Sequence, residues 1–191
     1  MLINQNRLSV RKALEADFEN IIDYFLNADK DFLIGIGADI AKLPKREEWL
    51  ALLLEDFQQK IEDRKFFYVI WLMDNEPVGH SNINKIVFGE AAYMHLHLWN
   101  PAKRRKGAGA ELVKRSLPYY FETFKLKIVY CEPYAFNPAP NKTLEKIGFD
   151  FTKQYETTPG WINYHQTVNR WCLTFDKFQT ICTVSGMSYP I

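Results

Sequence analysis

The sequence predicts a mixed α/β (α+β) protein with a mostly antiparallel, twisted sheet of about six or seven strands, flanked by about four helices. Three observations support this prediction. Hydrophobic residues make up 47% of the 191 residues and aromatic residues 15%, which is enough for a real core. The apolar periodicities follow the order strand, two helices, three strands, helix, strand, helix, two strands. The one strand–helix–strand crossover in that order predicts a parallel pair of strands.

The N-terminal part of the chain reads as one strand and two helices. Residues 7–14 read as a strand, and residues 15–28 carry apolar side chains at helical spacing. Residues 29–44 contain glycines and lack a clear period, so we expect an irregular segment there. A second helix is expected over residues 45–63, where Trp49 and five further apolar residues share one face.

The remaining elements follow a change in residue composition near residue 66, where β-branched and aromatic residues become frequent. Turn-forming residue types at 74–77 and 89–90 favour antiparallel hairpins, and Gly148 is a typical helix stop. We interpret residues 1–176 as a single domain and 177–191 as a C-terminal tail. The expected elements are strands at 66–72, 78–88 and 91–99, a helix at 107–124, a strand at 127–133, a helix at 139–147, and strands at 151–156 and 168–175.

Composition and charge exclude several classes of partner. The 24 basic and 23 acidic residues give a net charge of +1, which offers no support for nucleic-acid or membrane binding. No apolar run approaches the roughly 20 residues of a membrane span, and the first residues do not read as a signal peptide. The three cysteines are odd in number and form no CxxC motif, which favours a reduced, cytoplasmic protein. We expect a monomer or homodimer.

The most informative segment is a basic, glycine-containing turn that opens the helix at 107–124. The first N–H groups of a helix lack partners within it and lie at the positive end of its dipole, so small residues there admit a phosphate or pyrophosphate. Leu112 excludes a dinucleotide-binding fingerprint, and a GxxxxGK[ST] loop is absent from the sequence. The alternative is a tight helix start with a solvated basic face. The candidate phosphate-binding residues are Arg104, Arg105, Lys106, Gly107, Ala108, Gly109 and Ala110.

Two motifs in this order resemble those of the GCN5-related N-acetyltransferases (GNAT). Arg104-x-x-Gly107-x-Gly109 is similar to the family's coenzyme A pyrophosphate loop, and the segment from Asn137 to Phe149, ending Glu-Lys-Ile-Gly-Phe, is similar to its second motif. The resemblance covers about residues 7–175. It implies that acetyl-CoA is the co-substrate and that the parallel strands at the centre of the sheet splay apart to admit the pantetheine arm.

The same resemblance implies roles for further coenzyme-contacting residues. Backbone groups of Leu98 and Trp99 would bond to the pantetheine, and a backbone N–H would polarise the thioester carbonyl. Asn137 matches the family asparagine on the pantetheine side. Asn141 and Lys142 are expected to face the nucleotide end.

Transfer of acetyl to an amine requires a neutral amine, so a general base is expected. Glu132, five residues before Asn137, is the candidate, because some relatives place a catalytic glutamate at this spacing. The alternative for Glu132 is a carboxylate paired with a lysine at the strand end. Tyr134 shares its strand face and could donate a proton to the thiolate, but a core or rim tyrosine is the alternative. Leu144 stands where many relatives carry a tyrosine acid.

The acceptor is expected to be an amine of a small molecule or a protein N-terminus. The segment between the first two helices and the final hairpin would border its site, with aromatic residues available for cation–π contact. His97 could serve as a second base, because histidine titrates near neutrality; packing is its alternative. The candidate acceptor-site residues are Phe32, Asp39, His95, Trp161 and Tyr164.

Two rival functions stay open at this stage. His80, His95 and His97 fall on adjacent strands and could together hold a zinc ion, as in a metal-dependent hydrolase or lyase. That site would leave the glycine-containing turn unexplained, so we predict no metal. The second rival is a non-catalytic acyl-CoA-binding sensor or module, which the absence of the tyrosine at Leu144 would favour.

Overall fold

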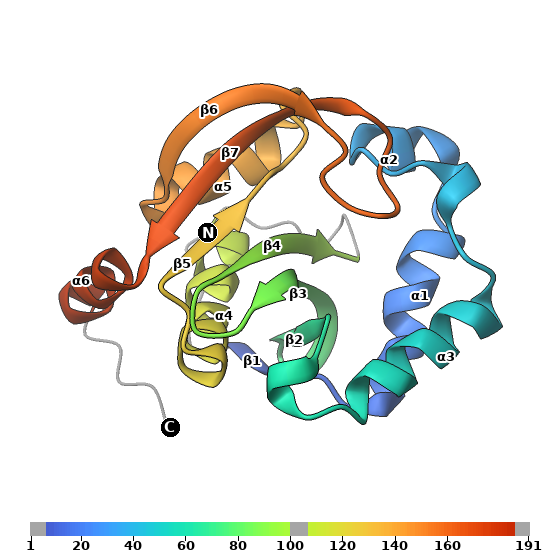
Figure 1. The fold of residues 1–191 in the computed structure, drawn as a ribbon, viewed down its shortest axis with the longest axis horizontal. Coiled ribbons are helices and arrows are strands. Elements are labelled where there is room, and N and C mark those ends of the chain that lie inside the picture. The colour runs from blue at the N-terminus through green and yellow to red at the C-terminus, as the bar shows by residue number, and fades with distance from the viewer. Residues whose placement is uncertain (1–6, 100–106, 186–191) are drawn as a thin grey trace.

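The protein folds around a seven-stranded mixed sheet (Figure 1). The computed structural model describes residues 7–99 and 107–185. The strand order is β1-β2-β3-β4-β5-β7-β6, and neighbours are antiparallel except for β4 and β5. The strands are β1 (Leu8–Lys12), β2 (Phe67–Met73), β3 (Glu76–Val87), β4 (Ala91–Leu98), β5 (Ile128–Cys131), β6 (Asp150–Thr157) and β7 (Gln166–Thr174). The predicted fold class and the parallel central pair are therefore confirmed.

The helices lie between the strands in the predicted order, with additions. The α-helices are α1 (Phe18–Leu26), α2 (Lys30–Gly35), α3 (Arg46–Phe57), α4 (Ala108–Phe124), α5 (Pro138–Ile147) and α6 (Phe175–Ser185), and the 3-10 helices are η2 (Glu15–Asp17), η3 (Ile40–Lys42) and η4 (Ile61–Asp63). The irregular segment expected at residues 29–44 contains α2 and η3. Short side chains start both: Asp29 accepts the Phe32 N–H at 2.7 Å, and Asp39 accepts the Ala41 N–H at 3.1 Å.

The helix predicted over residues 45–63 is wrong in its second half. It ends at Phe57, because the buried Asp56 carboxylate accepts the backbone N–H groups of Lys65 and Phe66 at 2.7 and 3.1 Å. These bonds turn the chain back toward β2. Apolar periodicity alone does not reveal such a turn, since Ile61 continues the helical spacing after the helix has ended.

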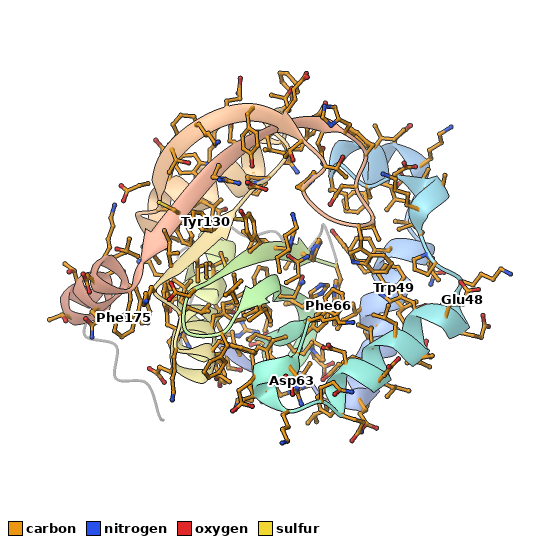
Figure 2. The ribbon with its side chains drawn as sticks, in the orientation of Figure 1. Glu48, Trp49, Asp63, Phe66, Tyr130 and Phe175 are labelled. Atoms are coloured by element: carbon orange, nitrogen blue, oxygen red, sulfur yellow. The ribbon has the colours of Figure 1, made fainter. Side chains whose placement is uncertain are left out.

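The helices cover opposite faces of the sheet and bury two apolar clusters. One cluster joins the sheet to α4, α5 and α6, and contains Leu112, Leu117 and Leu144. The other joins the opposite face to α1, α2 and α3, and contains Phe18, Ile22 and Trp49. Figure 2 shows Glu48 on the outer side of α3, whereas Trp49 points toward the middle of the molecule. The sheet therefore lies between two layers of helices and packs against both.

The parallel strands β4 and β5 pair over only part of their length. Their register runs from Ala91 opposite Ile128 to Met94 opposite Cys131, and then stops. Beyond Met94, β4 continues to Leu98 beside β3, whereas the chain after β5 follows β7 through an isolated bridge between Tyr134 and Val168. In the described chain, the β5-facing edge of β4 therefore has no strand partner from His95 to Leu98. The two strands diverge, and this divergence creates the candidate site.

The loop between β6 and β7 crosses to the region of α2 (Figure 1). Ala38 and Asn163 form an isolated bridge, Asp39 donates its N–H to the Ile162 carbonyl at 2.8 Å, and Asn163 Nδ2 donates to the Gly37 carbonyl at 2.7 Å. Gly37 has φ +83°, a conformation that favours glycine. These bonds join two segments far apart in the sequence into one border of the site.

The chain after β7 forms a packed helix. Phe178 of α6 is buried and stacks on Phe121 of α4, with ring centroids 4.6 Å apart. The division of the chain at Asp176 stays a prediction, but the first turns of α6 belong to the core.

Candidate functional site

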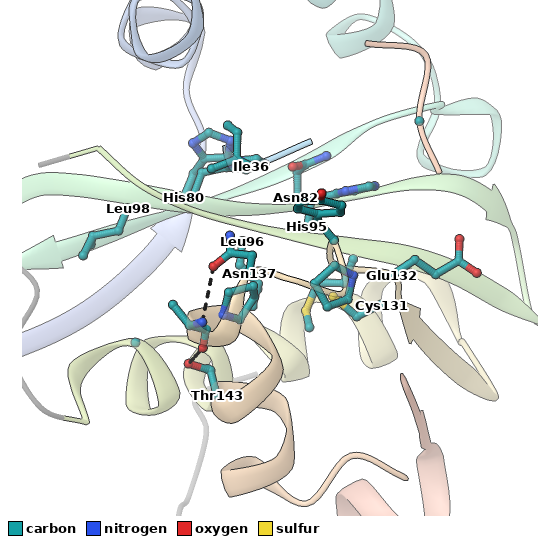
Figure 3. A pocket seen from close by; sticks show the side chains of 18 of the residues that line it. Ile36, His80, Asn82, His95, Leu96, Leu98, Cys131, Glu132, Asn137 and Thr143 are labelled. Atoms are coloured by element: carbon teal, nitrogen blue, oxygen red, sulfur yellow. Dashed lines mark hydrogen bonds between the residues drawn. The ribbon is translucent and has the colours of Figure 1, made fainter. Parts of the chain in front are cut away.

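A cleft of about 630 Å³ opens where β4 and β5 diverge (Figure 3). One end lies between α4 and α5, and the other lies under α1, α2 and the β6–β7 loop. In the close-up, Asn137 and Thr143 of the α5 region lie on one side of the strands, and His80 and Ile36 lie on the other. The cleft therefore passes through the gap in the sheet and links its two faces.

The N-terminus of α4 faces the first end of the cleft. Gly107 is the N-cap residue with φ +90°, and the three residues after it, Ala108, Gly109 and Ala110, also line the cleft. Gly107 has no side chain with which to cap this helix start. The first N–H groups, with the positive end of the helix dipole, thus face the cleft across small residues. The predicted Arg104, Arg105 and Lys106 lie outside the described residues.

Lys146 of α5 is a cleft residue that the sequence analysis missed. A Cβ built on Gly107 would stand 3.4 Å from Lys146 Nζ, so the ammonium lies beside the start of α4. No described residue forms an ion pair with Lys146. An ammonium next to the positive end of a helix is electrostatically unfavourable, and an anion between them would stabilise both. Lys142, one helical turn earlier, also lines the cleft, so the four-residue spacing of the two lysines was the available signal.

The start of α5 provides the polar residues on this side. Asn137 lines the cleft and caps the helix, accepting the Ala139 N–H at 3.3 Å. Asn141 does not line the cleft. Its amide donates to the Tyr134 and Asn137 carbonyls and accepts from Asn169 and Trp171, at 2.8–3.2 Å. These four bonds use the capacity of an asparagine side chain, so Asn141 fixes α5 against β7.

Leu144 stands in the core, fully buried against α4, and does not line the cleft. The side chains that α5 presents to the cleft are Ala139, Pro140, Lys142, Thr143 and Lys146.

Glu132 lines the cleft directly after β5 and is held by an ion pair. Its Oε1 accepts from Arg170 Nε at 2.6 Å and from the Tyr155 hydroxyl. Arg170 also donates to Tyr155 at 2.6 Å and to Tyr93 at 3.1 Å. Among the described residues, Oε2 receives no hydrogen bond. The partner is thus an arginine of β7 and not the lysine considered from the sequence, and one carboxylate oxygen stays available to a ligand.

Two of the cleft histidines form a stacked pair. The rings of His80 and His97 lie 4.7 Å apart at 30°, and Trp99 Nε1 donates to His80 Nδ1 at 2.8 Å. Burial lowers the pKa of His80 to about 3 and that of His97 well below its ordinary value, with neighbouring histidines adding to the effect. Both rings are therefore neutral at physiological pH. The backbone of Trp99 was predicted to bind the coenzyme; Trp99 does not line the cleft, and its indole N–H is bound to His80.

His95 faces the same compartment. Its Nε2 lies 3.1 Å from Asn84 Oδ1, and burial, together with the charge of Lys85, lowers its pKa to about 4. In the part of the chain that the structure describes, no three histidine, cysteine or carboxylate side chains are arranged to hold a metal ion. One ring nitrogen of His80, Nδ1, is engaged by Trp99 Nε1.

The end of the cleft under α1, α2 and the β6–β7 loop, called the acceptor end below, contains some of the predicted acceptor-site residues. Phe32, His95 and Trp161 line the cleft, and so does Tyr134. Asp39 and Tyr164 do not: Asp39 caps η3, and the Tyr164 hydroxyl donates to the Ile34 carbonyl at 2.9 Å. Both contribute to the border between α2 and the β6–β7 loop. Their polar side chains suggested a ligand, but both are bonded to backbone groups of the protein.

Two acceptor-end residues were missed. Trp49 of α3 and Gln166 of β7 both line the cleft, and both are buried, with 2% and 6% of their surface exposed. Trp49 had been assigned to the core face of its helix, and Gln166 precedes the expected last strand. Sequence gives no signal that brings these positions, more than a hundred residues apart, to one cavity.

The fold is that of a class of protein, the acetyltransferases with a GNAT domain. Residues 7–150 match the family described as acetyltransferase (GNAT) domain, and the chain belongs to this family. No curated protein sequence matches the chain.

Solved structures with the same fold include two acetyltransferases in complex with coenzyme A. The spermidine N-acetyltransferase SpeG from Vibrio cholerae, in complex with CoA and spermine, has a TM-score of 0.71 and 18% identity, with 91% of this chain and 99% of that chain covered. RimL, a ribosomal L7/L12 alpha-N-protein acetyltransferase, in complex with CoA, has a TM-score of 0.70 and 16% identity, with 90% and 96% covered. Identities this low establish the shared fold.

None of the helices described here is long and apolar enough to cross a membrane.

Proposed function

We propose that this protein is an N-acetyltransferase that moves an acetyl group from acetyl-CoA to an amine by direct attack on the thioester. The observation that carries the proposal is the uncapped, glycine-lined start of α4 facing a cleft that passes between β4 and β5. The first N–H groups of α4, with Lys146 beside them, suit the pyrophosphate. Asn137 and Lys142 are further contacts on this side, and the unpaired edge of β4 from His95 to Leu98 suits the pantetheine arm.

The chemistry then takes place where the cleft crosses the sheet. The amine nitrogen attacks the carbonyl carbon, a nitrogen–carbon bond forms, and the carbon–sulfur bond breaks. The proton lost by the amine passes to Glu132 Oε2, directly or through water, and the leaving thiolate receives a proton from the Tyr134 hydroxyl. A backbone N–H on the free edge of β4 stabilises the oxyanion.

The residues around Glu132 act as positioning groups. Arg170 and Tyr155 hold Oε1, so the carboxylate presents Oε2 in a fixed direction. The neutral histidines His95 and His97 shape the floor of the acceptor end, and His97 is the second candidate for the base.

The test of this proposal is coenzyme binding followed by transfer. We expect coenzyme A to bind to the purified protein in isothermal titration, and we expect free thiol to appear when acetyl-CoA and a primary amine are both present. Gly107→Glu should abolish binding, because its carboxylate would repel the pyrophosphate at the start of α4. Tight binding with no transfer to any amine would favour the non-catalytic module instead.

Gly89→Glu is a matched control for this variant. Gly89 also has a positive φ, +77°, but it lies in the turn between β3 and β4 with no heavy atom within 4 Å of a built Cβ, and it does not line the cleft. Both variants place a glutamate at a position with positive φ, and both change the charge by the same amount. Unchanged coenzyme affinity in Gly107→Glu would remove the start of α4 from the proposal.

A further inference from the structure

We infer that the acceptor is a polypeptide with acidic residues close to its reacting amine, and that a basic face of the sheet beside the cleft binds these residues. This inference rests on the proposed function and names its substrate class. The basic face consists of three cations and three tyrosines on neighbouring strands: Lys85, Arg170, Lys153, Tyr93, Tyr130 and Tyr155.

The side chains of the basic face form one continuous cluster. The Arg170 guanidinium lies among three tyrosine rings, with distances to the ring centroids of 5.7 Å for Tyr93, 5.4 Å for Tyr130 and 5.1 Å for Tyr155. Lys85 Nζ lies 4.9 Å from the centroid of Tyr93, and Lys153 Nζ lies 4.4 Å from that of Tyr155. A cation over an aromatic ring is attracted by the ring quadrupole, so the tyrosines hold the three charges in place.

The backbone at Lys85 directs its side chain to this face. The register of β3 against β4 shifts between Asn84 and Val87, and Lys85 has φ +46°, in the left-handed region that side chains other than glycine rarely adopt. An irregularity of this kind re-aims a side chain. Here it places the ammonium over Tyr93. Strained backbone gathers at functional sites, which favours a binding role for this charge.

The basic face has an excess of positive charge. Arg170 is paired with Glu132 at 2.6 Å, whereas neither Lys85 nor Lys153 forms an ion pair with any described residue. Both lysines are exposed, so a partner can reach their ammonium groups without rearrangement of the protein. Like charges held on one face repel one another, and the carboxylates of a bound partner would offset this repulsion.

The basic face begins at the edge of the cleft. Glu132 lines the cleft and accepts the bond from Arg170. His95 also lines the cleft and stands two residues from Tyr93, on the same face of β4. The helices α1 and α3 lie well apart from β5 and β6 in Figure 1, so they do not cover this part of the sheet. A chain whose amine reaches Glu132 can therefore continue directly onto the basic face.

The width of the basic face favours an extended polypeptide over a small molecule. Its members come from five strands that are neighbours in the sheet, in the order β3, β4, β5, β7 and β6. Neighbouring strands lie about 4.8 Å apart, so the face spans roughly 19 Å. An extended chain rises about 3.3 Å per residue, so about six residues after the amine would cross it.

Nucleic acid is the other polyanion that a basic face can bind. It fits this face less well, because bases stack on free aromatic rings, whereas cations already lie over Tyr93 and Tyr155. The acceptor must also carry a nucleophilic amine, and the amino groups of nucleobases are conjugated with their rings. An acidic polypeptide has both the charge and the amine.

The experiment compares four acceptors with acetyl-CoA: spermidine and three hexapeptide amides that begin with two alanines and continue with four glutamates, four glutamines or four arginines. We expect kcat/KM to be highest for the glutamate peptide, by about tenfold over the glutamine peptide, with a difference that shrinks as salt is added. Equal values for these two peptides, or a preference for spermidine or for the arginine peptide, would overturn the inference. An RNA hexamer that inhibits transfer more strongly than the N-acetylated glutamate peptide would also overturn it. Failure of coenzyme A to bind in isothermal titration would instead overturn the proposed function.

A double variant tests the two unpaired lysines. Lys85→Gln with Lys153→Gln should lower by about fivefold the ratio of kcat/KM for the glutamate peptide to that for the glutamine peptide. The matched control is Lys125→Gln with Lys60→Gln, which removes the same charge from two exposed lysines. Lys125 also has a positive φ, +51°, and lies 5.8 Å from the centroid of an aromatic ring.

The control should leave the ratio of the two peptides unchanged. A loss of folding alone lowers the rate with both peptides and does not alter their ratio. A constant ratio in the double variant of the basic face, or an equal fall in the control, would therefore overturn the assignment of the acidic segment to this face.

Discussion

Gly109→Ala separates coenzyme binding from stability, because the two properties should move in opposite directions. Gly109 lies in the first turn of α4 and lines the cleft. Its φ is not in the left-handed region, and a built Cβ meets no heavy atom of the described residues within 4 Å. The alanine therefore fits the protein without strain. A ligand against the helix start would meet the added methyl group, whereas the described residues would not.

The expected magnitudes follow from this geometry. Replacing a helical glycine by alanine stabilises by about 0.5–1 kcal/mol, which corresponds to a rise in Tm of about 2 °C for a domain of this size. A methyl group between the first N–H groups and a phosphate would remove one hydrogen bond to a charged group, about 2 kcal/mol or roughly thirtyfold in Kd. Thermal unfolding without ligand and isothermal titration with coenzyme A measure the two effects.

Gly35→Ala is the control for this experiment. Gly35 ends α2, has no positive φ and has nothing within 4 Å of a built Cβ, but it lies at the acceptor end. The Gly35→Ala protein should be stabilised to a similar degree as Gly109→Ala and should keep the wild-type affinity for coenzyme A. If Gly109→Ala raises the Tm but leaves the Kd for coenzyme A unchanged, no phosphate approaches the start of α4 and the reasoning is refuted.

Three further predictions concern the charged and titratable groups of the cleft. Lys146→Gln should weaken coenzyme A binding about tenfold and flatten the dependence of Kd on salt concentration; an unchanged salt dependence would contradict a phosphate contact. Glu132→Gln should lower kcat by roughly 10²-fold while coenzyme A affinity stays constant, and an unaltered pH–rate profile would exclude Glu132 as the base. The pKa of His95 is about 4 in the folded protein and about 6.5 in the unfolded chain, so the unfolded state binds the proton first as the pH falls. The contribution of His95 to the free energy of unfolding is thus complete above pH 6.5 and declines toward pH 4, by up to about 2 kcal/mol at pH 5. Urea unfolding at pH 7.5 and pH 5 measures this loss, which should be smaller in His95→Gln than in the wild-type protein. Equal losses in the two proteins would refute this.

Local patterns were sufficient for the elements that carry their own signals. Gly148 ends α5 with φ +105°, and the glycine-containing turn precedes α4, as the residue types indicated. Predictions went wrong where a side chain bonded to the backbone turns the chain, as Asp56 does at the end of α3. At the site, Asn141 and Tyr164 have the chemistry of ligand contacts but find their partners on other elements, and Asp39 caps the short helix that follows it.

The sequence by itself determined the class of fold and the place of the helix start at Gly107, because periodicity, glycine and proline act through neighbouring residues. Only the tertiary structure decided which side chains share the cleft. Trp49, Lys146 and Gln166 meet there because β4 and β5 diverge and the β6–β7 loop bonds to α2. These residues come together through packing between segments far apart in the chain, and local sequence patterns do not predict the free energy of such contacts.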